Sequence, residues 1–183
     1  MMHLIPDFLD TAIISNLVST YNSHPKVSNP ATVSGRKGIK DRVLFIQAEG
    51  LSQSLLPYIE KHFANPHPLV YGMISKTYEG APRHTDHGGG DLNRVQTLVP
   101  LDWDTDGNNP CTVLYQTETN DGLYHAYRDE DPQPELGPYD LVRWEIGTAI
   151  CFNSRQWHSG SNFELDKVNW KMYILIDHGA QLK

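Results

Sequence analysis

Two short stretches, far apart in the chain, carry the residue types that bind transition metals. His84 and Asp86 are separated by one residue, and His158 follows far downstream. In a β-strand, residues two apart point to the same side, so His84 and Asp86 can reach one ion. Two histidines and one carboxylate suit non-haem Fe(II), which needs open positions for a co-substrate and O2, although Zn²⁺ and Mn²⁺ also accept these ligand types.

Each of these residues also has an ordinary structural explanation. His84 and Asp86 can form a hydrogen-bonded pair in a polar turn before the glycines at 88–90, and His158 can be a satisfied histidine near the end of a strand. A histidine-x-aspartate triplet arises easily by chance in a chain with 9 histidines. The triplet alone therefore does not decide between the structural and the metal-binding explanation.

The segments that must position these residues change in character along the chain. Apolar residues recur at helical spacing from Asp10 to Tyr21 and from about Ser52 to Phe63, where Pro57 is tolerable only in the first turn. Between them, Ser23–Lys40 is rich in Ser, Pro, Gly and basic residues, which predicts a long loop and a candidate lid.

From Leu69 onward the apolar pattern shifts to a period of two, broken by clusters of turn residues. This pattern predicts strands at Leu69–Thr77, Arg94–Leu101, Thr112–Gln116, Asp140–Trp144, Thr148–Phe152 and Trp170–Ile176, with an earlier strand at Val43–Gln47. Two helices and six or more strands predict a mainly β fold with flanking helices (α+β), of the jelly-roll type, with the two N-terminal helices packed on one sheet.

Composition narrows the class of protein. The 183 residues predict one domain, residues 1–183, and the 39% hydrophobic share is enough for one sizeable core. A net charge of -7 disfavours a nucleic-acid-binding role, and two cysteines make no disulfide framework. We recognise neither a signal peptide nor a run of about 20 apolar residues, so we expect a cytoplasmic protein with no membrane partner.

Three segments together resemble the 2-oxoglutarate/Fe(II)-dependent dioxygenases, especially the prolyl 4-hydroxylase-like branch. The stretch from Tyr78 through His84 to Asp86 is similar to their aromatic-then-histidine-x-aspartate segment. Gly147–Phe152, followed by Trp157-His158-Ser-Gly, is similar to their second signature, and the opening Ile5–Asp10 resembles the start of many members. The likeness covers nearly the whole chain in the same order.

The resemblance implies a distorted double-stranded β-helix that holds Fe(II) at its open end. His84, Asp86 and His158 would then be the metal ligands and the catalytic centre, with 2-oxoglutarate and O2 as co-substrates. The family also places a basic residue at the start of the last barrel strand, where it pairs with the distal carboxylate of 2-oxoglutarate.

Two lysines compete for that basic position. Lys167 has the commoner family spacing from His158, but it sits in a polar segment where solvation is the simpler explanation. Lys171 opens a plausible strand in which its neighbours alternate, so we choose Lys171 and keep Lys167 as the alternative. Tyr71 and Tyr78 are further candidates for a hydroxyl contact to the same carboxylate, and ordinary core packing explains either tyrosine as well.

The function implied by the resemblance is hydroxylation, coupled to oxidative decarboxylation of 2-oxoglutarate to succinate and CO2. The primary substrate would be a peptide or protein side chain, prolyl among them, or a small molecule. The alternative is a non-catalytic or degenerate cupin-like jelly-roll module that binds metal without turnover. Cupins usually place two histidines close together, and the sequence contains no histidine-x-histidine.

Overall fold

The computed structural model describes residues 2–30, 39–44, 51–64, 71–78, 83–86, 95–104, 109–119, 135–160, 170–178 and 181–182. The two helices are α1 (Thr11–Ser23) and α2 (Leu51–His62). The strands are β1 (His3–Ile5), β2 (Val27–Pro30), β3 (Ile39–Leu44), β4 (Phe63–Ala64), β5 (Tyr71–Thr77), β6 (Val95–Trp103), β7 (Cys111–Glu118), β8 (Tyr139–Arg143), β9 (Ala149–Asn153), β10 (Gln156–Gly160), β11 (Lys171–His178) and β12 (Gln181–Leu182).

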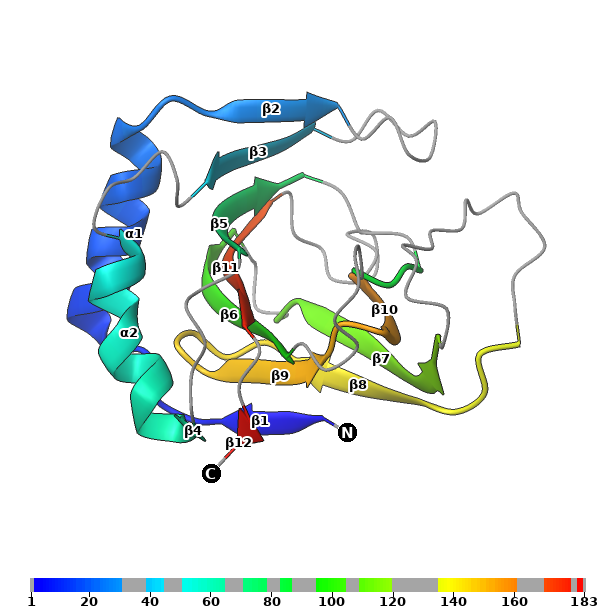
Figure 1. The fold of residues 1–183 in the computed structure, drawn as a ribbon. Helices are drawn as coiled ribbons and strands as arrows, with labels where there is room; N and C mark the ends of the chain where they lie inside the picture. Colours follow the sequence, from blue (N-terminus) through cyan, green and yellow to red (C-terminus); the bar gives the residue numbers. More distant parts are fainter. Residues whose placement is uncertain are drawn as a thin grey trace.

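Two antiparallel sheets form the body of the molecule (Figure 1). The larger has the strand order β1-β9-β6-β11-β5-β3-β2, and the smaller has the order β10-β7-β8. One apolar cluster draws Met73, Leu98 and Leu175 from the larger sheet and Leu114 and Val142 from the smaller one, so it fills the space between the two sheets. This arrangement confirms the expected double-stranded β-helix with mainly β content.

A second apolar cluster packs the helices against the outer face of the larger sheet. Leu17 of α1 and Leu55 and Ile59 of α2 are fully buried there together with Ile74 and Ile174 of the sheet. Figure 1 shows both helices on the same side of this sheet. The predicted packing of two N-terminal helices on one sheet is therefore confirmed.

Strand β11 shows how one strand serves both clusters. Met172, Ile174 and Ile176 pack with the helices, whereas Tyr173 and Leu175 face the space between the sheets. Because side chains alternate along a strand, this assigns the positions from Lys171 to Ile176 to one face or the other. We refer to the face that carries Tyr173 and Leu175, and its counterparts on neighbouring strands, as the interior face.

The segment 23–40 differs from its prediction as one long loop. Val27–Pro30 is a strand that pairs with β3, with Val27 opposite Arg42 and Pro30 opposite Ile39. Among the described strands it lies at the edge of the larger sheet, where polar residues and a proline are tolerated because one side needs no ladder hydrogen bonds. Residues 31–38, on which the lid prediction rests, lie outside the described part.

Two other boundaries moved. The strand predicted at Val43–Gln47 begins instead at Ile39 and ends at Leu44. Helix α2 begins at Leu51, so Pro57 lies inside the helix rather than in its first turn. A proline there removes one backbone hydrogen bond, and we attribute its tolerance to the complete burial of Leu55 and the near-complete burial of Ile59 on either side of it.

None of the helices within the described ranges is both long and apolar enough to cross a membrane.

The side chain of Asp10 links the two helices, so we expect its removal to lower the stability of the protein. Its Oδ1 caps α1 by accepting from the amides of Ala12 (2.9 Å) and Ile13 (3.0 Å), and its Oδ2 accepts from the Tyr58 hydroxyl of α2 at 2.7 Å. The hydrogen bonds from Ile13 and Tyr58 lower the pKa of Asp10 below its usual 3.8. Asp10→Ala should therefore lower the melting temperature at neutral pH, because it removes the helix cap and the link to α2.

The pH dependence of this effect follows from the sign of the shift. A lowered carboxyl pKa gives stability that is present above pH 3.8 and is lost as the pH falls through the lower native value. Circular dichroism melts should show the gap between wild type and Asp10→Ala shrinking in acid. Tyr58→Phe, which keeps the cap, should reproduce only part of the gap. A gap that does not change with pH would contradict the assigned role of the carboxylate.

Candidate metal centre

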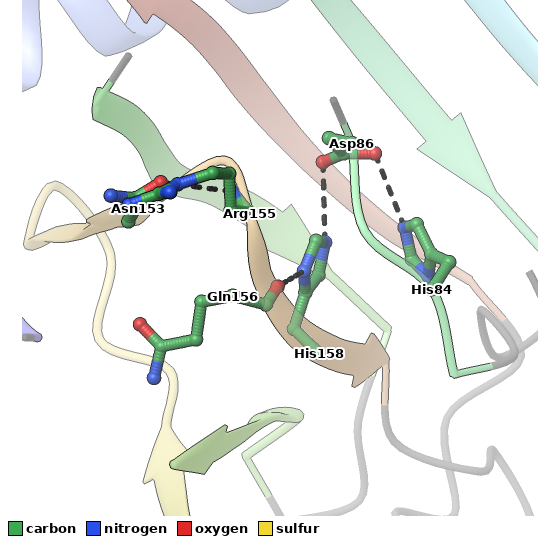
Figure 2. Close-up of polar contacts among 6 residues, drawn as sticks. All are labelled: His84, Asp86, Asn153, Arg155, Gln156 and His158. Atoms are coloured by element: carbon green, nitrogen blue, oxygen red, sulfur yellow. Dashed lines mark hydrogen bonds and ion pairs between the residues drawn. The ribbon is translucent and has the colours of Figure 1, made fainter. Parts of the chain in front are cut away.

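The structure brings the three sequence-predicted ligands together at one point. One ligand atom from each of His84, Asp86 and His158 lies within 4.8 Å of the others. Each oxygen of the carboxylate faces a different imidazole: Asp86 Oδ1 lies 3.4 Å from His84 Nε2, and Asp86 Oδ2 lies 3.2 Å from His158 Nε2 (Figure 2). The three groups therefore converge at one point, whereas the structural explanation accounts only for a pair formed by His84 and Asp86.

Main-chain hydrogen bonds hold the two distant segments side by side. His84 N donates to His158 O at 2.8 Å, and His158 N donates to His84 O at 2.9 Å. These two bonds form an isolated antiparallel bridge between His158 of β10 and His84, which belongs to no strand. A third bond, from Asp86 N to Ser154 O at 3.1 Å, ties the same segment to the turn between β9 and β10. The spacing of the ligands is thus fixed by the backbone.

A local irregularity in β10 accompanies the position of His158. The pairing of β10 with β7 shifts register between Gln156 and His158. Bulges of this kind redirect a side chain and are frequent beside functional sites. The Gln156 side chain also donates from Nε2 to the Tyr115 carbonyl at 2.9 Å, which attaches this part of β10 to β7.

The orientation of the His158 ring suits metal binding. His158 Nδ1 lies 2.9 Å from the carbonyl oxygen of Gln156 (Figure 2). Because a carbonyl oxygen only accepts hydrogen bonds, Nδ1 carries the proton in this contact. Nε2, on the far side of the ring, is then the nitrogen that faces Asp86 and offers a lone pair to an ion. The Phe152 ring, 4.8 Å from the His158 ring between centroids, covers one side.

The carboxyl group of Asp86 is held in its charged form. Burial by itself raises the pKa of Asp86, but the attraction of His158 and His84 and their hydrogen bonds lower it more. The net pKa of Asp86 is well below the usual value of 3.8. A carboxylate must be deprotonated to bind a metal, and Asp86 meets this condition.

The donor geometry fits a first-row transition metal. Imidazole nitrogens and carboxylate oxygens bind such ions at about 2.0–2.2 Å, so two donors at a right angle lie about 3 Å apart. The separations of 3.2 and 3.4 Å from Asp86 to the two imidazoles are close to this value. Two nitrogens and one oxygen form one face of a coordination sphere and leave the opposite positions for other ligands.

Lys171 enters the space between the sheets. It is the first residue of β11, is only 2% exposed, and its Nζ lies 5.1 Å from the centre of the Trp144 ring. The preceding residue is anchored in two directions: Trp170 N donates to Asp104 Oδ1 at 2.7 Å, and Asp104 N donates to Trp170 O at 3.2 Å. This anchor fixes where β11 begins and hence the place of Lys171.

The other residues predicted to contact the co-substrate gain no support from the structure. Tyr78 follows β5, is 40% exposed, and has Lys76 Nζ 5.6 Å from its ring centre. This surface position lends no support to a contact with a buried carboxylate, so the role of Tyr78 stays a prediction. The side chain of Tyr71 and the whole of Lys167 lie outside the described residues.

The two cysteines do not offer a second reactive centre. Neither Cys111 nor Cys151 forms a disulfide, and both are buried. Burial raises the pKa of the Cys151 thiol to about 11, which its hydrogen bond with Thr97 offsets only in part. The reactive thiolate is therefore scarce at neutral pH, and Cys151 is a poor candidate for a nucleophile.

Sequence reasoning missed the residues that act through their backbone. The carbonyl oxygens of Ser154 and Gln156 position Asp86 and His158, respectively. Every residue type carries such a carbonyl, so no side-chain pattern could have marked these two positions. Strand β10, which carries His158, was also not predicted, because its five residues show no strict alternation.

The sequence matches no protein-family model and no curated protein. Solved structures are similar over nearly the whole chain. One is the non-heme alpha ketoglutarate dependent epimerase SnoN from nogalamycin biosynthesis, with a TM-score of 0.65, 13% identity, and coverage of 97% of this chain and 77% of that chain.

Two prolyl hydroxylases share the fold as well. The enzyme from Trichoplax adhaerens, solved with a hypoxia inducible factor peptide fragment, has a TM-score of 0.57, 12% identity, and coverage of 97% of this chain and 82% of that chain. The prolyl-4-hydroxylase of Pseudomonas putida has a TM-score of 0.51, 13% identity, and coverage of 97% and 91%. At such low identity these likenesses establish the fold, which is the double-stranded β-helix of the 2-oxoglutarate oxygenases.

The convergence of the three ligands generates a metal-binding prediction. Adding Mn²⁺ or anaerobic Fe²⁺ should raise the melting temperature of the chelator-treated protein, because an ion that binds only the folded state stabilises it. The free energy of unfolding rises by about 2.7 kcal/mol when the concentration of free metal is about 100 times its Kd. Asp86→Ala and His158→Ala should abolish the gain, whereas His3→Ala, at an exposed histidine of β1, should retain it. An equal gain in all three variants would show that the ion binds elsewhere.

Proposed function

We propose that this protein is a 2-oxoglutarate- and Fe(II)-dependent oxygenase that uses O2. His84, Asp86 and His158 are the proposed iron ligands and catalytic centre. The observation that carries the proposal is the convergence of these three side chains at the bridge between β10 and the 83–86 segment of a double-stranded β-helix. Similar folds have been solved with iron and alpha ketoglutarate bound, and with nickel and 2-oxoglutarate bound.

The ligand residues contribute a fixed and partly apolar coordination site. Asp86 supplies the negative charge and is itself held by the Ser154 carbonyl, while the Gln156 carbonyl keeps His158 Nε2 directed at the ion. The bound iron would supply O2 activation coupled to oxidative decarboxylation of 2-oxoglutarate to succinate and CO2. A carboxylate at position 86 occupies the place that a halide ligand needs, which favours oxygen transfer over halogenation.

Lys171 is the proposed partner of the distal carboxylate of 2-oxoglutarate. Burial of an ammonium group at 2% exposure lowers the stability of the fold unless the charge is paired. A dicarboxylate with one end at the metal can present its other carboxylate to Lys171, since both lie on the inside of the fold. Lys167 remains the alternative from sequence spacing.

The proposed reaction is hydroxylation of a primary substrate. Candidates are a peptide or protein side chain, prolyl among them, and a small molecule. Similar structures include a prolyl hydroxylase with a peptide and a protein with hygromycin B bound, which support both kinds of substrate. Others are an epimerase and a carbocyclase, so the product must be identified by mass spectrometry rather than assumed from succinate release.

The co-substrate assignment can be tested without knowing the primary substrate. Anaerobic Fe(II) and 2-oxoglutarate should give a weak visible charge-transfer band, and Asp86→Ala should lose it. Lys171→Met keeps most of the length of the side chain but removes the ammonium, and should weaken the binding of 2-oxoglutarate about tenfold to a hundredfold in a titration of the band.

A matched lysine variant provides the control. Lys76→Met removes an ammonium that lies 3.9 Å from the Trp170 ring centre, and it should leave the affinity for 2-oxoglutarate unchanged. In air, the wild type should release succinate from 2-oxoglutarate, and Asp86→Ala should not. If metal binds at the three ligands but neither band nor succinate appears, the protein is a metal-binding module without this activity.

A further inference from the structure

Strand β8 forms one edge of the smaller sheet and is paired on one side only. In the order β10-β7-β8, β8 contacts β7, and within the described ranges no strand lies on its other side, which we call the open edge (Figure 1). The edge of a sheet presents backbone N–H and C=O groups that can pair with another chain. The open edge of β8 is therefore a candidate docking surface for an extended segment.

The other edge strands of the two main sheets carry features that oppose such pairing. Strand β1 has only three residues, β2 ends in Pro30, and β10 shifts its register beside His158 and is bridged to His84. Short strands, prolines and bulges are the usual protection of sheet edges. Strand β8 has none of these three features, because its pairing with β7 is regular from Tyr139 to Arg143 and includes no proline.

The hydrogen bonds between β8 and β7 determine which backbone groups reach the open edge. Trp144 N donates to Pro110 O at 2.7 Å, and Gln116 N donates to Pro138 O at 3.0 Å, so residues 138 and 144 face β7. Along an antiparallel strand, successive residues direct their N–H and C=O groups to alternate sides. The residues of β8 whose backbone groups point to the open edge are therefore Tyr139, Leu141 and Arg143.

The same stretch exposes apolar side chains. Val142 packs into the cluster between the two sheets, so the alternation of side chains places Leu141 on the outer face of the smaller sheet. Leu141 is 52% exposed and Tyr139 is 59% exposed. Leu141 also lines a groove together with Leu4 of β1, which is 49% exposed. Apolar side chains gathered on a surface in this way indicate an interaction site.

The sequence of β8 is complementary to itself in antiparallel pairing. With a twofold axis at Leu141, each Leu141 lies opposite its copy, and each Tyr139 lies opposite Arg143 of the other copy. A guanidinium group over a tyrosine ring is attractive, and the two leucines bury apolar surface. Asp140 then lies opposite Val142, so no two like charges are directly opposed. The three residues that direct backbone groups outward are also the ones that this register pairs.

We propose that the open edge of β8 is a dimerisation surface whose partner is the β8 edge of a second copy of this chain. Two 3-stranded sheets then join into one continuous sheet. His158 lies on β10, at the far edge of the smaller sheet. Because neighbouring strands are about 4.8 Å apart, the two β10 strands of the dimer are separated by about 24 Å. The interface therefore excludes the metal centre, and the proposal does not depend on the proposed function.

Disulfide cross-linking tests whether the axis lies at Leu141. Directly opposed residues that exchange backbone hydrogen bonds have Cα atoms about 5.5 Å apart, within the span of about 4.4–6.8 Å that a disulfide bridges. Mild oxidation should therefore convert Leu141→Cys to a covalent dimer on a non-reducing gel. The wild type should not be cross-linked, because Cys111 and Cys151 are buried. The matched control is Ile146→Cys, at a 53% exposed position beyond the end of β8, which should not be cross-linked either.

A mixing experiment tests the register. Tyr139→Cys and Arg143→Cys proteins should be cross-linked to each other when they are oxidised together. Neither should be cross-linked when it is oxidised alone, because the two copies of one position are then offset by about 13 Å along the strands. Cross-linking of Tyr139→Cys to itself, or an absence of cross-links in the mixture, would contradict the pairing described above.

Sedimentation equilibrium tests the assembly without any cross-link. Over protein concentrations from about 1 μM to about 1 mM, a range that covers weak interfaces, the wild type should show a reversible dimer. Leu141→Asp places two carboxylates opposite each other on the axis, so it should weaken the dimer at least about tenfold. Ile146→Asp, with the same charge change, should dimerise like the wild type.

The remaining readouts separate an interface effect from a folding defect. Leu141→Asp should keep the wild-type circular dichroism spectrum and the Mn²⁺-induced rise in melting temperature, because Leu141 is exposed and the metal ligands lie elsewhere. If Leu141→Asp loses its fold, the cross-linking pattern of the cysteine variants decides instead. A wild-type protein that stays monomeric over the whole concentration range, or a folded Leu141→Asp that dimerises as strongly as the wild type, would overturn the proposal.

Discussion

The reciprocal hydrogen bonds between the main chains of His84 and His158 are the constraint on which the rest of the site depends. They join two segments that are distant in sequence, at 2.8 and 2.9 Å, outside any regular strand pairing. With this bridge in place, Asp86 needs only the bond to the Ser154 carbonyl to meet both imidazoles. The side chains contribute the chemistry, but the peptide groups determine whether they meet.

The second feature that organises the structure is the difference between the two faces of the larger sheet. One face receives the helices and is closed by apolar residues such as Ile74 and Ile174. The other face is also largely apolar, yet it admits Lys171. The proposed function places the distal carboxylate of 2-oxoglutarate on this side of the sheet, beside Lys171.

Much of the site could be predicted from the sequence because it depends on residue type and strand periodicity. The types and order of His84, Asp86 and His158 predicted that these side chains could share one metal ion, and the structure brings them together. The alternation around Lys171 located the start of β11 correctly. Long apolar patterns also located both helices and the central strands to within a few residues.

The features that the sequence analysis did not predict depend on strand pairing and tertiary packing rather than on residue type. Val27–Pro30 is polar and ends in proline, and it becomes a strand only because β3 lies beside it. Pro57 is accommodated inside α2 by tertiary packing that local propensity cannot express. The open edge of β8 gives no signal in the sequence, since alternation predicts a strand but not which strands lie beside it.

The dependence of the ligand geometry on main-chain atoms has an evolutionary consequence. Ser154 and Gln156 act on Asp86 and His158 through carbonyl groups that any amino acid would provide, so these two contacts do not themselves require a particular side chain. Such a scaffold tolerates wide drift in its side chains. A fold of this kind can therefore persist among proteins that share only 13% of their residues, while the surrounding surface is free to acquire new substrates.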